Sequence, residues 1–288
     1  MSLIEKAAEK LNLASPVPPE AVAETPDTRL EPQNTTATEH TWQAKVDLAR
    51  LRGLNIITPN GDYSATAEEF RMVKRPLLNN AFGAEGQKFK NANLIMVTSC
   101  FPGEGKSFCT LNLAMSFAME MDRTVLLVDA DVSKPTVLSV LGIEAEKGLL
   151  DLLEDKDLNP SEVLIKTSVP NLTVLPAGRH NANATELLAS ETMARLLDDL
   201  AHRYHDRVIL FDSPPLLVTT EASVLSTHMG QIVMVVEAGK TPQPAIKAAL
   251  GMVSSCGYVG LLLNKTENRL GFDKYGYGYG YGYGYGRS

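Results

Sequence analysis

The sequence predicts an α/β protein built in three layers, α/β/α, with helices covering both faces of a mostly parallel central sheet. Short, continuous apolar runs alternate along the chain with segments of helical periodicity, which is the order expected for βαβ units. The runs lack the polar–apolar alternation of a half-exposed strand, and unbroken runs are typical of strands covered on both faces. Strands are expected at residues 93–98, 125–128, 172–175, 208–211, 232–236 and 259–263.

Helical periodicity lies between these runs. One helix is expected directly after the first strand, where Leu111, Leu113 and Phe117 recur with helical spacing. Another is expected over residues 185–204, where apolar side chains again repeat every three or four positions.

The composition of the chain divides it into four parts. Residues 1–13 place apolar side chains on one stripe, which predicts a short amphipathic helix. Residues 14–41 are rich in Pro, Thr, Ala and Glu, which is typical of a flexible linker. The folded domain is expected at residues 42–270, and residues 271–288 are expected to be a disordered tail in which glycine and tyrosine alternate.

Charge and cysteine content exclude several classes of function. A net charge of −7 without a dense basic block argues against nucleic acid as the main partner. Cys100, Cys109 and Cys256 are too few and too scattered for a disulfide framework or a zinc site, so reduced thiols in the cytoplasm are expected. No run reaches the length of about 18 apolar residues that a spanning helix needs, so any membrane association is expected to depend on a partner.

A glycine-rich loop joins the first predicted strand to the helix that follows, with the sequence Cys-Phe-Pro-Gly-Glu-Gly-Lys-Ser at residues 100–107. Glycines let successive N–H groups face phosphate oxygens, a lysine neutralises the terminal phosphates and a hydroxyl joins the Mg²⁺ shell. Cys100 stands where the usual pattern has its first glycine, and a chance Gly-Lys-Ser turn is the alternative. The nucleotide-binding residues predicted from this loop are Pro102, Gly103, Glu104, Gly105, Lys106, Ser107 and Phe108.

Acidic residues follow two further predicted strands. Asp129 and Asp131 come after the strand at 125–128, and Asp212 comes after the strand at 208–211. Ligands of open α/β sheets bind at the carboxyl ends of the strands, and oxygen-rich clusters there hold hydrated Mg²⁺ beside phosphates. A single acid after a strand is as often a helix cap, but three acids together with the loop favour a site for ATP and Mg²⁺.

These motifs resemble the bacterial protein-tyrosine kinases of polysaccharide synthesis and export, from about residue 42 to the C-terminus. Asp129 and Asp131 match the family's apolar-Asp-x-Asp motif, and Asp212 with Pro215 matches its Asp-x-x-Pro motif. Residues 1–6 and 74–78 are most similar to the exosortase-associated exopolysaccharide branch.

The resemblance implies a ring-like homo-oligomer that phosphorylates itself in trans. A transmembrane polysaccharide chain-length regulator would activate it, and would place it in the cytoplasm, peripheral at the inner membrane. Glu68, Arg71 and Lys74 match the family's subunit-contact motif Glu-x-x-Arg-x-x-Arg, with lysine at the last position. By the same resemblance, Asn264 and Lys265 after the last predicted strand are expected to contact the adenine base, although an asparagine at a strand end is as often only a turn residue.

The tail is the feature that distinguishes a kinase from a plain ATPase. A flexible tail can present successive hydroxyls to a neighbouring active site, whereas the alternative is a low-complexity segment that only mediates weak association. The predicted phosphoacceptors are Tyr275, Tyr277, Tyr279, Tyr281, Tyr283 and Tyr285.

The mechanism predicted from these residues is in-line transfer of the ATP γ-phosphoryl group to a tail tyrosine. Lys106 neutralises the transferring group, while Ser107, Asp131 and Asp212 hold Mg²⁺. Asp129 accepts the tyrosine proton, although the roles of Asp129 and Asp131 are interchangeable at this stage.

Two alternatives differ in function class. A partition- or septum-site-type ATPase switch would carry an additional lysine early in the loop, where this chain has Phe101-Pro102-Gly103. A nucleotide-binding scaffold without phosphotransfer would not need acids at all three motifs.

Overall fold

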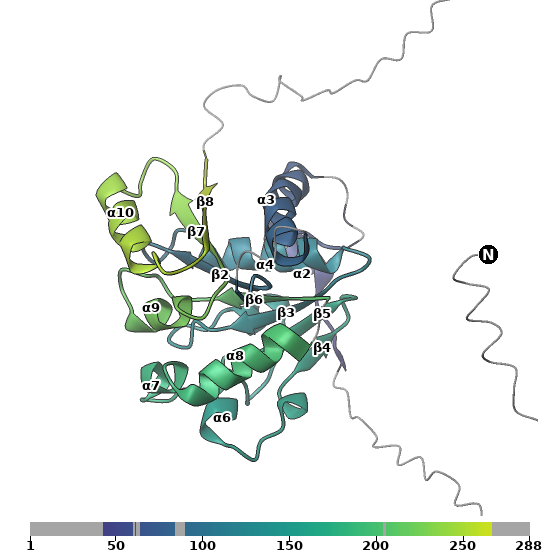
Figure 1. The fold of residues 1–288 in the computed structure, drawn as a ribbon. Helices are drawn as coiled ribbons and strands as arrows, with labels where there is room; N and C mark the ends of the chain where they lie inside the picture. Colours follow the sequence, from purple (N-terminus) through teal and green to yellow (C-terminus); the bar gives the residue numbers. More distant parts are fainter. Residues whose placement is uncertain (1–42, 60, 62–63, 84–89, 204–205, 267–288) are drawn as a thin grey trace, which may run out of the picture. The chain divides into compact units, whose positions relative to one another are not determined.

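The computed structural model describes residues 43–59, 61, 64–83, 90–203 and 206–266, which form a three-layer α/β/α domain (Figure 1). The described part begins at Gln43, next to the predicted start of the folded domain. The predicted N-terminal helix (1–13), linker (14–41) and tyrosine tail (271–288) lie outside the described residues.

The middle layer is a sheet whose strands, within the described ranges, are β1 (Gln43–Ala44), β2 (Leu94–Ser99), β3 (Thr124–Asp129), β4 (Ile165–Thr167), β5 (Leu172–Leu175), β6 (Arg207–Asp212), β7 (Gln231–Glu237) and β8 (Tyr258–Asn264). All six predicted strands are confirmed, with ends within one residue of the prediction. The sequence did not predict β1 and β4, which lie at one edge of the sheet.

The strand order is β1-β4-β5-β3-β6-β2-β7-β8. Strands β5, β3, β6, β2, β7 and β8 run parallel, whereas β4 is antiparallel to β5 and parallel to β1. The carboxyl ends of β2, β3 and β6 therefore meet at the same edge, with Asp129 and Asp212 opposite each other in the β3–β6 register. This register brings the two predicted acidic motifs together.

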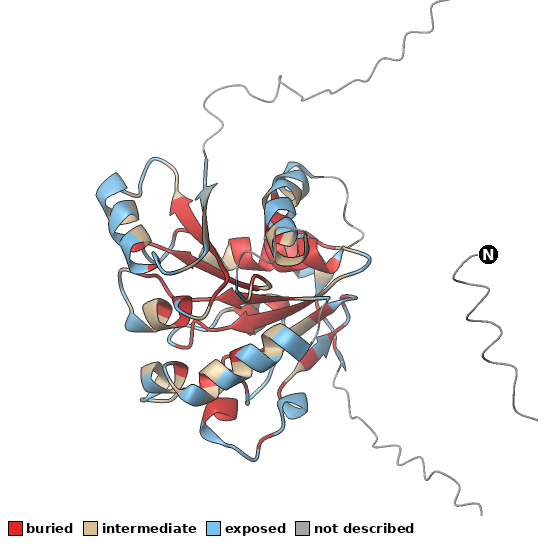
Figure 2. Cartoon of the chain, viewed as in Figure 1, coloured by how far each residue is buried: buried red, intermediate tan, exposed pale blue. Residues whose placement is uncertain are grey.

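Two apolar cores lie on the two faces of the sheet, because successive side chains of a strand point to opposite sides. Ile95 and Val97 of β2 belong to one core, while Leu94 and Met96 belong to the other. All four side chains are fully buried, which explains the unbroken apolar runs in the sequence. Figure 2 shows the central strands as the most buried part of the domain.

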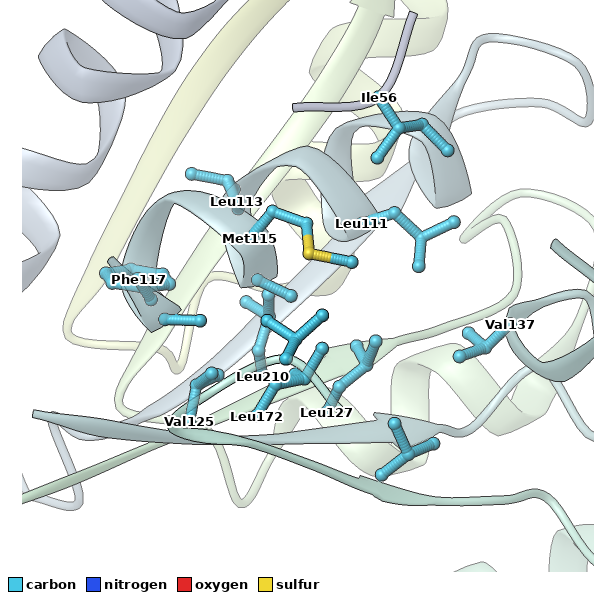
Figure 3. Packing of buried hydrophobic residues seen from close by; sticks show 14 of the residues in the cluster. Ile56, Leu111, Leu113, Met115, Phe117, Val125, Leu127, Val137, Leu172 and Leu210 are labelled. Carbon is cyan, nitrogen blue, oxygen red and sulfur yellow. The ribbon is translucent and has the colours of Figure 1, made fainter. Parts of the chain in front are cut away.

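One face is covered by α2 (Leu48–Gly53), α3 (Ala65–Phe82), α4 (Lys106–Ala118) and α5 (Val137–Leu141). Helix α4 lies over the centre of the sheet, and its Leu111 and Met115 face the strand side chains Leu127 and Leu210 (Figure 3). Burying one such side chain contributes about 1.5–3 kcal/mol, so α4 is held firmly along its length.

The other face is covered by α6 (Leu149–Glu154), α7 (Ala184–Leu188), α8 (Glu191–Arg203), α9 (Thr220–Ser226) and α10 (Gln243–Met252). The helix predicted over 185–204 is two helices, α7 and α8, because the chain is interrupted at Ala189 and Ser190. The Ser190 hydroxyl donates to the Leu187 carbonyl and accepts from the Met193 N–H, so it satisfies backbone groups at the break.

Candidate functional site

The glycine-rich loop lies between β2 and α4, at the carboxyl edge of the sheet, as predicted. Gly103 and Gly105 have φ angles of 86° and 97°, in the left-handed region that favours glycine. At Gly105 an added Cβ atom would collide with the end of the Asn264 side chain, and the left-handed φ strains any residue that has a side chain. Helix α4 begins at Lys106, and its first backbone N–H groups have no partner within the helix. This end of α4 is suited to phosphate groups.

Lys106 is the cation of the loop. Its Nζ lies 2.5 Å from Asp131 Oδ2 and 3.3 Å from Ser107 Oγ. The other carboxylate oxygen of Asp131 accepts a hydrogen bond from the Lys134 N–H at 3.2 Å. Both oxygens of Asp131 are therefore engaged in this structure.

Asp212 lies at the end of β6 and is fully buried. Its Oδ1 accepts a hydrogen bond of 2.9 Å from the Thr110 hydroxyl of α4, while Oδ2 is buried without a protein partner. Burial raises the pKa of Asp212, although Lys106 and hydrogen bonds from Ser107 and Thr110 oppose the shift. An unpaired buried carboxylate oxygen is costly, so this atom is a natural ligand for a cation.

Asp129 is also buried, at the end of β3. Its Oδ2 accepts the backbone N–H groups of Thr136 and Val137 at 3.1 and 3.0 Å, and its Oδ1 is buried without a partner. Burial raises the pKa of Asp129 to about 7, and the neighbouring Asp212 carboxylate adds to the shift. The two carboxylates of the Asp-x-Asp motif are thus held in different environments.

A cavity of about 600 Å³ borders Asp129. It is lined by residues of α5, of the segments after α5 and β5, and by Arg50 of α2. Leu138 and Ile143 supply apolar wall, so the cavity combines an apolar surface with one buried carboxylate.

Side chains from the end of β8 and from the segments that follow β7 and β8 hold the loop from the other side. Asn264 Nδ2 donates to the Glu104 carbonyl at 2.9 Å, and Lys265 Nζ donates to the Gly103 carbonyl at 2.6 Å. The Glu104 carboxylate bonds to the Thr241 hydroxyl. Sequence reasoning identified no role for Thr241 and expected Asn264 and Lys265 beside the adenine base, because these loop contacts depend on strands adjacent in the sheet but distant in sequence.

Two further contributors were also missed. Thr110 lies one helical turn after Lys106 and bonds to Asp212, so its spacing in the helix is the signal that could have identified it. The amides of Thr136 and Val137 left no signal in the sequence, because a backbone N–H is common to almost every residue.

The predicted subunit-contact residues all lie on α3. Glu68 is exposed and forms an ion pair with Arg71, which is half-buried. Lys74 is 4% exposed and points into its own chain, where Nζ donates to the Ser116 carbonyl at 2.6 Å and lies 2.7 Å from Glu120. The accessible part of the predicted contact therefore consists of Glu68 and Arg71.

The other predicted loop residues lie at the surface or at the start of α4. Pro102 and Gly103 are exposed in the loop, and Phe108 lies in the first turn of α4. No group of three or more His, Cys, Asp or Glu side chains in the described part of the chain is arranged as a metal site, so Mg²⁺ would need ligands from a nucleotide as well. No described helix has both the length and the apolar character for crossing a bilayer. The six tail tyrosines lie outside the described residues.

The sequence is similar to one protein family and to named tyrosine-protein kinases. A protein-family profile described as an AAA domain matches residues 92–244, more than half of the 288-residue chain. CapB of Staphylococcus aureus, named as a tyrosine-protein kinase, is 31% identical over 161 residues, which cover 56% of this chain and 68% of CapB. The tyrosine-protein kinase Wzc of Salmonella typhi is 31% identical over 157 residues, which cover 54% of this chain but only 21% of Wzc.

The fold is also similar to that of a solved structure. The crystal structure of the chimerical protein CapA2B2 superposes with a TM-score of 0.61 at 25% identity, covering 76% of this chain and 93% of the chimera. The chain thus spans about two thirds of CapB, most of the chimera and about a fifth of Wzc.

Proposed function

This chain belongs to the AAA-domain family and to the bacterial tyrosine-protein kinases, and from that membership we propose that it transfers the γ-phosphoryl group of Mg·ATP to tyrosines in the tail of a neighbouring copy. The observation that carries the proposal is the pair of buried carboxylates, Asp129 and Asp212, placed side by side at the edge of the phosphate loop.

The residues present fit a nucleotide and a magnesium ion. The loop amides and the N-terminus of α4 would receive the phosphates, with Lys106 neutralising their charge. The unpaired Oδ2 of Asp212 and the hydroxyl of Ser107 would hold Mg²⁺, with Asp131 contributing once Lys106 turns to the phosphates. When bound, Mg²⁺ supplies positive charge that stabilises the phosphate oxygens during transfer.

Asp129 is the better candidate for the group that accepts the tyrosine proton. Asp131 is engaged by Lys106 and by the Lys134 amide, whereas Asp129 has one oxygen fixed and one free. A base is most effective when its pKa lies near the working pH, and the pKa of Asp129 is about 7. Two backbone amides fix the orientation of the carboxylate, so the free oxygen has a defined direction.

The cavity beside Asp129 is the proposed entrance for the acceptor. Its apolar wall of Leu138 and Ile143 suits a phenol ring, and Asp129 offers the acceptor for its hydroxyl. A cavity of about 600 Å³ exceeds one aromatic side chain, so it can admit different tyrosines of a repetitive tail.

The proposed reaction between copies requires that subunits assemble. Glu68 and Arg71 on the outer side of α3 are proposed to contact a second subunit of a ring-like homo-oligomer, which would bring one tail to the next active site. The cytoplasmic end of a transmembrane polysaccharide chain-length regulator is the proposed activator, which would hold the kinase at the inner membrane. Each phosphate adds a charge of about −1.5 to −2, so a modified tail would repel its neighbours and loosen the ring. Exopolysaccharide synthesis or export is the process that this cycle would regulate.

A mixing experiment tests transfer between copies. An active chain ending at Lys274 has no tail tyrosines, and a Lys106→Met chain keeps its tail but lacks the phosphate-binding lysine. With Mg·ATP, phosphotyrosine is expected on the Lys106→Met chain only when both proteins are present. Asp129→Asn in the shortened chain serves as the control and should abolish the signal. A mixture that hydrolyses ATP without labelling either chain would rule out the proposed function.

A further inference from the structure

Two carbonyls of the phosphate loop accept hydrogen bonds from Asn264, the last residue of β8, and from Lys265, which follows it. Lys265 Nζ donates to the Gly103 carbonyl at 2.6 Å, and Asn264 Nδ2 donates to the Glu104 carbonyl at 2.9 Å. These two carbonyls point away from the phosphate side of the loop, because the loop amides point toward it in a phosphate-binding turn. The two hydrogen bonds therefore stabilise the loop conformation in which the backbone amides can bind phosphate groups.

A second set of bonds fixes the same loop through the Glu104 side chain, which is 3% exposed. Its carboxylate accepts the Phe101 N–H at 2.8 Å and bonds to the Thr241 hydroxyl. Thr241 in turn accepts the Glu237 N–H at 3.0 Å, at the end of β7. The segment after β7 thus contacts the loop through Thr241, as the end of β8 does through Asn264.

Lys265 is itself held in place. Its φ angle of 54° lies in the left-handed region, which is uncommon for a residue with a side chain. Its Nζ lies 3.2 Å from Glu237 Oε2, so one ammonium group links a loop carbonyl to the end of β7. Lys240 also pairs with Glu237, at 3.3 Å, but among the described residues it makes no hydrogen bond to the loop. The two lysines therefore form a matched pair that differs in the loop contact.

Asn264 and Lys265 are also the root of the tail. Tyr275, the first predicted phosphoacceptor, lies ten positions after Lys265 in the sequence. The two residues that contact the phosphate loop therefore also stand closest in the sequence to the segment that leads to the tail.

We infer that Asn264 and Lys265 are positioning residues that couple occupancy of the phosphate loop by a nucleoside di- or triphosphate to the conformation of the tail root. Coupling between two sites is reciprocal, so a change at the tail root alters nucleotide affinity by the same factor as nucleotide alters the tail root. The inference rests on the nucleotide site of the proposed function, but it does not depend on phosphotransfer.

Titration calorimetry with Mg·ADP on the full chain tests the inference. Lys265→Met removes the ammonium group but keeps the length of the side chain, and Lys240→Met is its control. Loss of one charge-assisted hydrogen bond should weaken Mg·ADP binding about five- to tenfold in Lys265→Met. Lys240→Met should stay within about twofold of the unchanged protein, and Lys265→Arg should recover most of the loss.

Amide hydrogen exchange supplies a readout that general destabilisation would not reproduce. Mg·ADP should slow exchange at residues 264–266 in the unchanged protein and in Lys240→Met, but not in Lys265→Met. Equal affinity and equal protection in all three proteins would overturn the inference while leaving the nucleotide site intact. Equal losses in both lysine variants would overturn it as well, because loss of charge alone would then explain them. If the unchanged protein bound no Mg·ADP, the proposed function would fall with it.

Discussion

Replacing Asp129 with asparagine should stabilise the protein while it abolishes phosphotransfer. Burial raises the pKa of this carboxyl from 3.8 to about 7. At about 1.4 kcal/mol per unit, the ionised carboxylate costs the folded state about 4 kcal/mol. Asparagine has no charge to bury, and its side-chain oxygen can still accept from the amides of Thr136 and Val137.

The pH dependence has a defined sign. The folded protein binds the Asp129 proton more tightly than the unfolded chain, so stability falls as the pH rises from about 4 to about 7. The gain from Asp129→Asn should therefore be about 2 kcal/mol at about pH 5.5 and about 4 kcal/mol at about pH 8. Urea unfolding without nucleotide or Mg²⁺ at the two pH values measures the difference.

Asp131→Asn is the matched control, since it lies two residues away in the same motif. Asp131 pairs with Lys106, whose side chain is only 12% exposed, so removing the acid leaves a cation without its partner and should destabilise the fold. Phosphotransfer by Asp129→Asn should fall at least about a hundredfold, the usual contribution of a general base. If Asp129→Asn gave no gain, or the same gain at both pH values, the assignment of a perturbed base would be refuted.

Three further tests address the packing around the phosphate loop, the placement of α3 and the burial of Cys109. Gly105→Ala should lower the folding stability by about 1–3 kcal/mol and weaken nucleotide binding, because the added methyl group meets Asn264 and φ is 97°. Adding Asn264→Ala to the same chain should relieve the collision but not the backbone strain. Urea unfolding measures the stability, and calorimetry measures the nucleotide affinity. Lys74→Met should lower the folding stability by about 2–4 kcal/mol, because it removes the buried contacts with Ser116 and Glu120. Arg71→Ala should instead reduce the oligomer mass in light scattering at unchanged stability. The reverse pattern would contradict the placement of α3. Burial raises the pKa of Cys109 to about 12, so iodoacetamide should label this thiol only after urea is added, and rapid labelling of the native protein would argue against its burial.

Much of the fold follows from the sequence because the central strands are covered on both faces. The run at β2 consists of side chains that serve two cores at once, so its apolar character has no gaps. Strand β4 has an exposed Lys166 between two buried residues, and β1 has only two residues, so neither produces a recognisable run. The break between α7 and α8 was missed because apolar spacing continues across Ser190, and only local hydrogen bonds end the first helix.

The sequence predicts those parts of the candidate site whose positions follow from the order and direction of the strands. Acids at the ends of neighbouring parallel strands must lie together, and Asp129 and Asp212 are direct register partners. Their different environments were not predictable, because they depend on which amides and cations lie within reach. The inward direction of Lys74 did leave a signal: Phe70, Lys74 and Leu77 have the spacing of one helix face, and all three are buried.

Intact mass spectrometry after incubation with Mg·ATP tests the central claim most directly. The full chain should gain successive additions of about 80 Da, one for each phosphate. Lys106→Met and a chain ending at Lys274 should gain none, because the first lacks the phosphate-binding lysine and the second lacks the acceptors. An unchanged mass in the full chain while ATP is hydrolysed would contradict the account and identify an ATPase without tyrosine transfer.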